Sequence, residues 1–165
     1  VAAGVFVLEL QEPTDLSILL EWQGFAVDGA KDGHLDLGFD LALQAADLDG
    51  MSASDLDRLV LTKESIEHAG LSSVMPAAAD QYFRAHRFEA SDGPVSVDAG
   101  FSIVLVLQGA GVLVSAAGSL EVARGDVVLV PFAAGEYALH SDGQGVPLVG
   151  VVCRPPAPDA PLGAR

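Results

Sequence analysis

Two carboxylates, Glu9 and Asp15, stand out by their positions in the largely apolar segment of residues 5–22, V-F-V-L-E-L-Q-E-P-T-D-L-S-I-L-L-E-W. Glu9 falls on a predicted strand, residues 4–11, that is otherwise apolar on both faces. Asp15 falls at the break that Pro13 makes before a second predicted strand, residues 17–22. Because an unpaired buried carboxylate costs several kcal/mol, Glu9 is expected to be paired, to bind a metal, or to face a wet cavity. The alternatives are an edge strand with Glu9 in solvent and an Asx turn at Asp15.

A second group with chemical potential is Q-Y-F-R-A-H-R-F-E, residues 81–89, which carries two of the eight basic residues of the chain. As a strand, this segment places Tyr82, Arg84, His86 and Phe88 on one face. That face could hold an anion, with Arg84 binding it through two nitrogens. The alternative is a solvated face on which arginine stems cover apolar surface.

The four histidines offer no metal site of their own. No two of His34, His68, His86 and His140 have the i, i+2 or i, i+4 spacing with which one strand or helix holds a metal. We therefore expect no complete metal site within this chain.

The charge of the chain restricts its partners. Eight Lys and Arg against 23 Asp and Glu give a net charge of −15. Such a surface repels nucleic acid and anionic membranes, and we exclude both as partners. A phosphorylated ligand would need the few basic groups to be gathered in one place.

The chain has no uninterrupted apolar run approaching 18 residues, so it is not expected to span a membrane. Its first residues lack the basic region of a signal peptide. Its single cysteine, Cys153, cannot form an internal disulfide, and its apolar neighbours predict that it is buried. These features predict a globular cytoplasmic protein.

The organisation of the chain changes twice along its length. Residues 28–75 have helical spacing in places, and Ser52 with Asp55 predicts a helix start, so this region is expected to be a short helical connector. From there, turn residues punctuate short apolar runs, which predicts a β-sandwich or barrel over residues 76–155. A disordered tail is expected over residues 156–165. The predicted strands of the barrel are residues 81–89, 95–97, 101–108, 112–115, 120–122, 127–130, 136–140 and 147–154.

Two segments resemble sequence motifs of the cupin fold. G-D-V-V-L-V-P-F-A-A-G, residues 125–135, resembles the second motif, and V-L-Q-G-A-G-V-L, residues 106–113, resembles the hairpin before it. Cupin metal sites take histidines from an H-x-H in the first motif and from a position shortly after the proline of the second. Here the first motif has no histidine, and Glu136 and Tyr137 occupy the later position. The resemblance implies a mainly β fold with a degenerate, metal-free cupin or jelly-roll barrel.

The order of the segments resembles the C-terminal portion of class I mannose-6-phosphate isomerase (phosphomannose isomerase), a zinc enzyme of the cupin superfamily. V-L-E-L-Q-E-P-T-D (residues 7–15), H-L-D-L-G-F-D-L-A-L (residues 34–43) and the barrel of residues 101–153 follow that order. The resemblance implies that residues 1–27 are the terminal strands of a preceding cupin barrel, which is largely absent from this chain.

The same resemblance implies roles for individual residues. Glu9 and Asp15 would be catalytic residues of the active cavity, and zinc would be held by ligands upstream of this chain. The arginine that the family places four residues after the equivalent of Asp15 is replaced here by Leu19. Either Arg84 binds the substrate in its place, or the substrate differs.

We therefore expect an aldose–ketose isomerase that interconverts mannose 6-phosphate and fructose 6-phosphate, with a phosphorylated sugar as its partner and a monomeric state. One alternative is a non-catalytic module in which a degenerate cupin recognises a sugar or a nucleotide sugar. Another is a purely structural or assembly domain.

Overall fold

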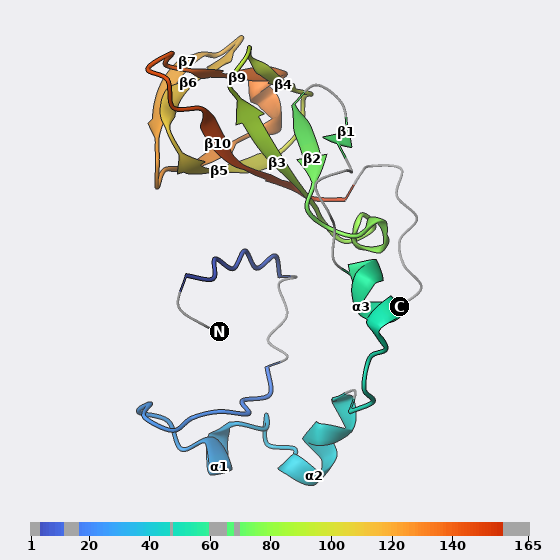
Figure 1. The fold of residues 1–165 in the computed structure, drawn as a ribbon. Coiled ribbons are helices and arrows are strands. Elements are labelled where there is room, and N and C mark those ends of the chain that lie inside the picture. The colour runs from blue at the N-terminus through green and yellow to red at the C-terminus, as the bar shows by residue number, and fades with distance from the viewer. Residues whose placement is uncertain (1–3, 12–16, 47, 60–65, 68–69, 157–165) are drawn as a thin grey trace. The chain divides into compact units, whose positions relative to one another are not determined.

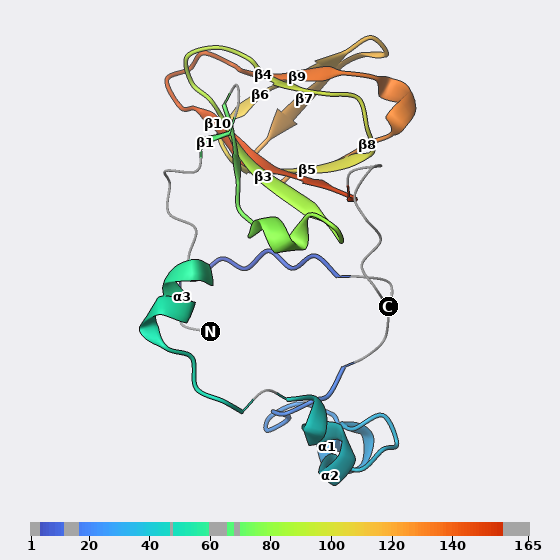
Figure 2. The ribbon, with the colours of Figure 1, turned by 90° about the vertical axis from the view of Figure 1, so that its right-hand side faces the viewer.

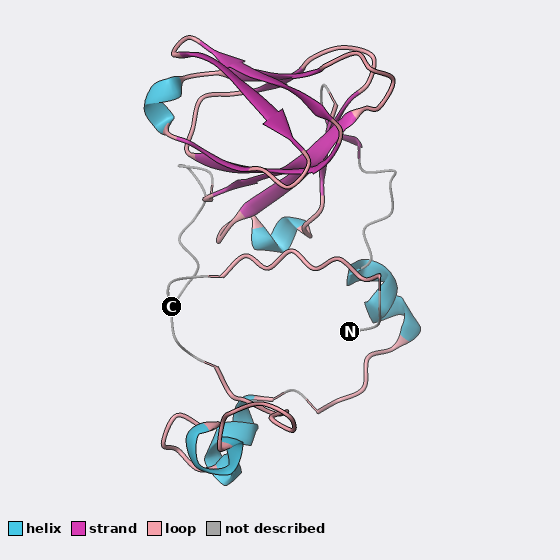
Figure 3. Ribbon diagram, turned by 90° about the vertical axis from the view of Figure 1, so that its left-hand side faces the viewer, coloured by secondary structure: helices cyan, strands magenta, loops and turns pink. Residues whose placement is uncertain are grey.

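The computed structural model describes residues 4–11, 17–46, 48–59, 66–67 and 70–156. The chain splits into two compact units, Val1–Leu56 and Asp57–Arg165. All the strands of the described residues lie in the second unit, whereas the first contains short helices (Figure 3). The predicted tail falls almost entirely on residues 157–165, outside the described part of the chain.

The helical character predicted after residue 28 is confirmed as far as Leu59. The helices are α1 (Gly29–Asp32), α2 (Phe39–Ala42), the 3-10 helix η1 (Leu43–Ala45) and α3 (Ala53–Leu59). The ring of Phe39 stacks on Trp22 with centroids 5.7 Å apart, and His34 meets Phe39 edge-on at 5.2 Å. These aromatic contacts are favourable beyond the area that they bury, and they pack α2 against Trp22 and His34, which lie on either side of α1 in the sequence.

The helix start predicted at Ser52 is also confirmed. The amide of Asp55 donates to Ser52 Oγ, and the amide of Ser52 donates to Asp55 Oδ2, each at 3.2 Å. This reciprocal pair is a capping box that satisfies amides which have no partner within the helix. Asp55 occupies the position of the capping box at which glutamate or glutamine is more common.

The strands predicted at residues 4–11 and 17–22 are not present as strands. The structure assigns no strand within the described residues of these segments, although residues 5–11 carry no helix or turn either. A strand needs a neighbouring strand for its hydrogen-bond ladder, and alternation of side chains supplies none. The assignment of residues 1–27 to a preceding barrel therefore stays a prediction.

The second unit is a jelly roll of two antiparallel sheets. Its strands are β1 (Ile66–Glu67), β2 (Leu71–Ser73), β3 (Arg84–Ala90), β4 (Val95–Val97), β5 (Ser102–Gln108), β6 (Ala110–Ser115), β7 (Gly118–Ala123), β8 (Val127–Val130), β9 (Tyr137–Ser141) and β10 (Leu148–Arg154). One sheet has the order β1-β2-β3-β10-β5-β8 and the other has the order β4-β9-β6-β7. The two sheets face each other in Figures 1 and 2. The order of β3 to β10 is that of two Greek keys, so the predicted cupin or jelly-roll fold is confirmed.

The core of the jelly roll lies between the two sheets. Its largest fully buried apolar side chains are Tyr137, Phe88, Leu139 and Leu148. The central strand β10 is buried along its whole length because β3 and β5 flank it. Cys153 on this strand is buried as predicted, and burial raises the pKa of its thiol, so its role is packing.

The sheet also begins earlier than expected. Residues 71–73 were predicted as part of the helical connector, but they form β2, which pairs with β3 from Leu71 opposite Phe88 to Ser73 opposite His86. Three residues are too few to display a period of two, so no pattern indicates this strand.

Among the described residues, no helix has both the length and the apolar character to cross a membrane.

Gly150 is required where β10 crosses the core. A Cβ at this position would overlap the carbonyl oxygen of Leu105 and lie 2.6 Å from the ring of Phe88. We expect Gly150→Ala to lower the free energy of unfolding by about 1–3 kcal/mol, because neither backbone nor ring has room to move. Denaturant titration measures this change.

The matched control is Gly93→Ala, since a Cβ at Gly93 would meet nothing within 4 Å. Its free energy of unfolding is expected to stay within about 0.5 kcal/mol of the parent protein. Equal effects of the two substitutions would contradict the close packing at Gly150.

Candidate functional site

Polar side chains gather at one end of the barrel interior, which we call the arginine end. Arg84 begins β3 and is paired with Arg154, the last residue of β10. Directly paired residues of neighbouring antiparallel strands point to the same face of the sheet. On the other neighbouring strand, β5, Ile103 pairs with Cys153, so Ser102 is the next residue in register. Ser102 therefore lies beside Arg154 on the same inner face, on the side away from Arg84.

Arg154 is almost completely buried, with 7% of its side chain exposed. One terminal nitrogen donates to a carboxylate oxygen of Asp98, and the other donates to the backbone oxygens of Asp98 at 3.2 Å and Ala99 at 3.0 Å. Gly100 lies directly over the guanidinium, where a Cβ would overlap it. Arg154 thus ties the loop of residues 98–101 to the end of β10.

The ion pair of Arg154 and Asp98 is unequal. The side chain of Asp98 is 81% exposed, whereas its partner is buried. The Nε atom of Arg154 is buried and has no hydrogen-bond partner among the described residues. Arg154 is thus a buried cation whose counter-ion lies mostly in solvent.

Arg84 adds a second cation beside Arg154. Its Nε donates to the backbone oxygen of Pro155 at 3.1 Å. Burial and then the positive charge of Arg154 lower the pKa of Arg84, while Asp98 and Asp80 act in the opposite direction. Arginine remains protonated in proteins, so the two guanidinium groups repel each other across the strand pair.

A buried pair of hydroxyls joins the two sheets next to these arginines. Ser102 Oγ and Tyr137 Oη are 2.9 Å apart, and both residues are fully buried. Burial raises the pKa of Tyr137, although the hydrogen bond with Ser102 and the charge of Arg154 partly offset this rise. The tyrosine is therefore a neutral hydroxyl, unsuited to act as a base.

The predicted site residues have different outcomes. Arg84, His86 and Phe88 alternate onto the inner face of β3 as the pattern predicted, but Tyr82 precedes the strand and is 47% exposed. Glu9 is exposed in the first unit. Asp15 lies outside the described residues, so the catalytic roles of these two carboxylates stay predictions.

Arg154, Asp98 and Ser102 were not recognised in the sequence as functional residues. Arg154 ends an apolar run and has Pro155 after it, which resembles a strand end on the surface. Only the register of β3 and β10 brings it beside Arg84. The one available signal was Tyr137, at the position where the cupin resemblance places a metal-binding histidine.

The donor set of the barrel does not fit a zinc ion. Zinc in proteins takes cysteine, histidine and carboxylate ligands. The interior position after Pro131 carries Tyr137, bonded to Ser102, and Arg154 adds a positive charge nearby. Among the described residues, no three His, Cys, Asp or Glu side chains are grouped to hold a metal.

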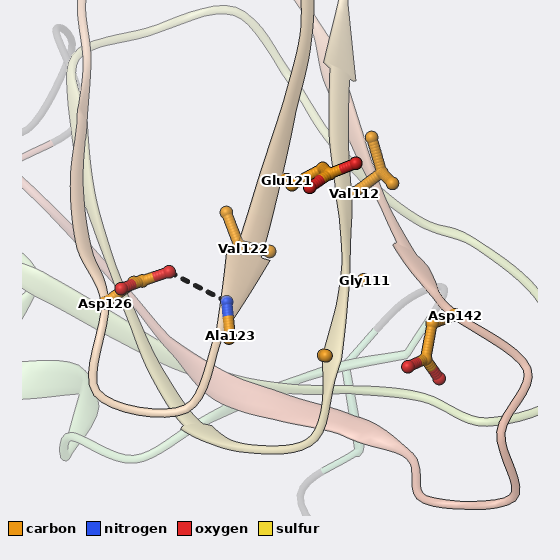
Figure 4. A pocket seen from close by; sticks show the side chains of 8 residues that line it. Gly111, Val112, Glu121, Val122, Ala123, Asp126 and Asp142 are labelled. Atoms are coloured by element: carbon orange, nitrogen blue, oxygen red, sulfur yellow. Dashed lines mark hydrogen bonds between the residues drawn. The ribbon is translucent and has the colours of Figure 1, made fainter.

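An open groove of about 450 Å³ lies on β6 and β7, away from the arginine end. Figure 4 shows Asp126 and Asp142 on opposite sides of this groove, with Gly111 between them. Asp126 accepts from the amide of Ala123 at 2.8 Å, and Asp142 accepts from the amide of Gln144 at 2.9 Å. Both carboxylates thus stabilise local turns.

Solved structures resemble this chain at low identity. The EutQ protein of Clostridium difficile is 9% identical, with a TM-score of 0.47, over 62% of this chain and 85% of its own. Ectoine synthase from P. lautus is 15% identical, with a TM-score of 0.45, over 65% of this chain and 80% of its own. Mannose 6-phosphate isomerase from Bacillus subtilis is 15% identical, with a TM-score of 0.48, over 72% of this chain and 34% of its own.

No protein family and no curated protein matches the chain. The cupin-type fold therefore rests on the strand order of the two sheets, and likeness at these TM-scores transfers no activity to this chain.

The hydroxyl pair gives a direct test of the site geometry. Tyr137→Phe leaves the buried hydroxyl of Ser102 without a partner, so we expect the free energy of unfolding to fall by about 1–3 kcal/mol. Ser102→Ala should cost a similar amount for the same reason. Denaturant titration of both variants and of the double variant gives the coupling.

The double variant should cost clearly less than the sum of the single variants, since it leaves no unpaired hydroxyl. Strict additivity would show that the two hydroxyls are not bonded to each other.

Proposed function

We propose that the barrel binds a small phosphorylated ligand of the sugar-phosphate class at its arginine end. The observation that carries this proposal is the pairing of Arg84 with Arg154. A chain with only eight basic residues and a net charge of −15 holds two of them at paired positions on the inner face of one sheet. A phosphate needs such a local concentration of cations, because the rest of the surface repels it.

Electrostatics favour an anion over a cation at this end. The two guanidinium groups repel each other, so an anion between them relieves a cost that the free protein bears. Guanidinium groups also present several donors in a plane that matches phosphate oxygens. Arg84 uses Nε to hold Pro155, and its terminal nitrogens have no hydrogen-bond partner among the described residues.

This proposal favours a binding role for the barrel itself. The neutral Tyr137 and Ser102 supply hydroxyls but no base, and the donor set does not fit zinc. The zinc-dependent chemistry of an isomerase would therefore have to come from elsewhere in the protein, as the family resemblance implies.

Isomerisation of mannose 6-phosphate to fructose 6-phosphate is the finer form of the proposal. It is supported by the segment V-L-E-L-Q-E-P-T-D, residues 7–15, and by the cupin-type barrel. In this form, Glu9 and Asp15 would act in a cavity whose zinc ligands precede this chain, and Arg84 would compensate for Leu19.

Binding of mannose 6-phosphate tests the role of Arg84. We expect Arg84→Gln to raise the Kd, measured by calorimetry, about 10- to 100-fold, because a charged hydrogen bond contributes about 1.5–3 kcal/mol. The matched control is Arg87→Gln, since Arg87 lies on the outer face of β3 and pairs with Glu89 at 2.6 Å.

Arg87→Gln removes the same charge and should leave the Kd for mannose 6-phosphate unchanged within about twofold. Unphosphorylated mannose should bind at least about tenfold more weakly to the parent protein. Equal affinities of the parent protein and Arg84→Gln would refute phosphate binding through Arg84.

The isomerase form has its own test. In a protein that contains this chain together with upstream zinc ligands, Asp15→Ala should lower the kcat for mannose 6-phosphate at least about tenfold, without changing the melting temperature. Unchanged turnover would remove Asp15 from the active site. Absence of turnover and of zinc in the parent protein would leave the non-catalytic binding module as the function.

A further inference from the structure

We propose that the carboxylate of Asp98 is a built-in competitor that occupies the position of the ligand's anionic group on Arg154. This inference rests on the proposed function and identifies the residue that sets its affinity. It follows from the unequal burial of the two partners of this ion pair.

Burial limits the access of a ligand to Arg154. Only 7% of this side chain is exposed, and its counter-ion Asp98 is 81% exposed. The backbone oxygens of Asp98 and Ala99 hold one terminal nitrogen, and Gly100 covers the guanidinium. The carboxylate of Asp98 therefore holds the other terminal nitrogen from the solvent side.

For an anion to reach Arg154, the side chain of Asp98 has to rotate. The side chain of Asp98 follows β4 on a loop, and rotation of that side chain requires no movement of a core residue. The two backbone bonds to Ala99 and Asp98 stay intact during this rotation because they involve a different nitrogen. Arg154 is thus prearranged for an anion, and rotation of the Asp98 carboxylate frees one of its terminal nitrogens.

The charge balance at Arg154 decides when Asp98 leaves it. When Asp98 rotates away, the buried guanidinium loses its counter-ion, so the open state is disfavoured until another anion takes that place. A phosphate attracted first by the half-buried Arg84 arrives beside Arg154, since the two arginines are paired across the strands. The exchange replaces one carboxylate by one phosphate and alters no covalent bond.

Competition of this kind weakens the apparent affinity by the fraction of molecules in which the site is open. If the carboxylate of Asp98 occupies Arg154 in about nine of ten molecules, its removal lowers the Kd for an anion about tenfold. Asp98 would therefore exclude weakly bound anions and admit only a ligand that makes further contacts.

The test is calorimetric titration of the full chain with inorganic phosphate and with mannose 6-phosphate. Asp98→Asn keeps the shape and an oxygen acceptor but removes the charge, and we expect about a tenfold lower Kd for phosphate than in the parent protein. The charge-matched control is Asp92→Asn, an exposed residue in the turn between β3 and β4 at the opposite end of the barrel. This control should bind phosphate as the parent protein does.

A second measurement uses only the parent protein, so it tests the inference even if Asp98→Asn fails to fold. Carbon-detected NMR of the parent protein at saturating phosphate should show a shift of the side-chain carboxyl resonance of Asp98 and of Arg154 Nε, with that of Asp92 unmoved. A shift at Arg84 without one at Asp98 would overturn the inference.

The outcomes separate the two proposals. Equal phosphate affinity of the parent protein and Asp98→Asn overturns the competitor role while phosphate binding stands. If neither protein binds phosphate or mannose 6-phosphate, both the competitor role and the proposed function are overturned. Tighter phosphate binding by Asp98→Asn, with unchanged binding by Asp92→Asn, supports both proposals.

Discussion

The burial of one guanidinium, that of Arg154, is the constraint on which the functional end of the barrel depends. Its bonds to Asp98 and Ala99 hold the loop that passes from β4 in one sheet to β5 in the other. Removing the carboxylate of Asp98 would leave a buried guanidinium without its counter-ion. The hydroxyl pair of Ser102 and Tyr137 is a second link between the sheets at the same end. The structure of this end and the proposed anion binding thus depend on the same few side chains.

Much of the barrel could be predicted from the sequence because its strands are apolar, alternating and bounded by turn residues. The predicted strands 95–97 and 127–130 coincide with β4 and β8, and the others begin or end within a few residues of those observed. Prediction failed where local pattern and pairing disagree. The short strand β2 gives no readable period, and residues 17–22 alternate like a strand but have no ladder in the described structure.

The candidate site was only half predictable for the same physical reason. Arg84 could be placed on an inner face because alternation along β3 is a local property. Its partner Arg154 comes beside it through the register of two strands that are distant in sequence, which no local pattern contains. The acidic composition indicates that any phosphate site must gather basic residues, but it does not indicate which ones.

A crystal structure of the protein grown with mannose 6-phosphate tests the central claim most directly. We expect phosphate oxygens about 3 Å from guanidinium nitrogens of both Arg84 and Arg154, with the carboxylate of Asp98 rotated towards solvent. A phosphate bound elsewhere on the barrel, or an arginine end without ligand at a saturating concentration, would contradict it.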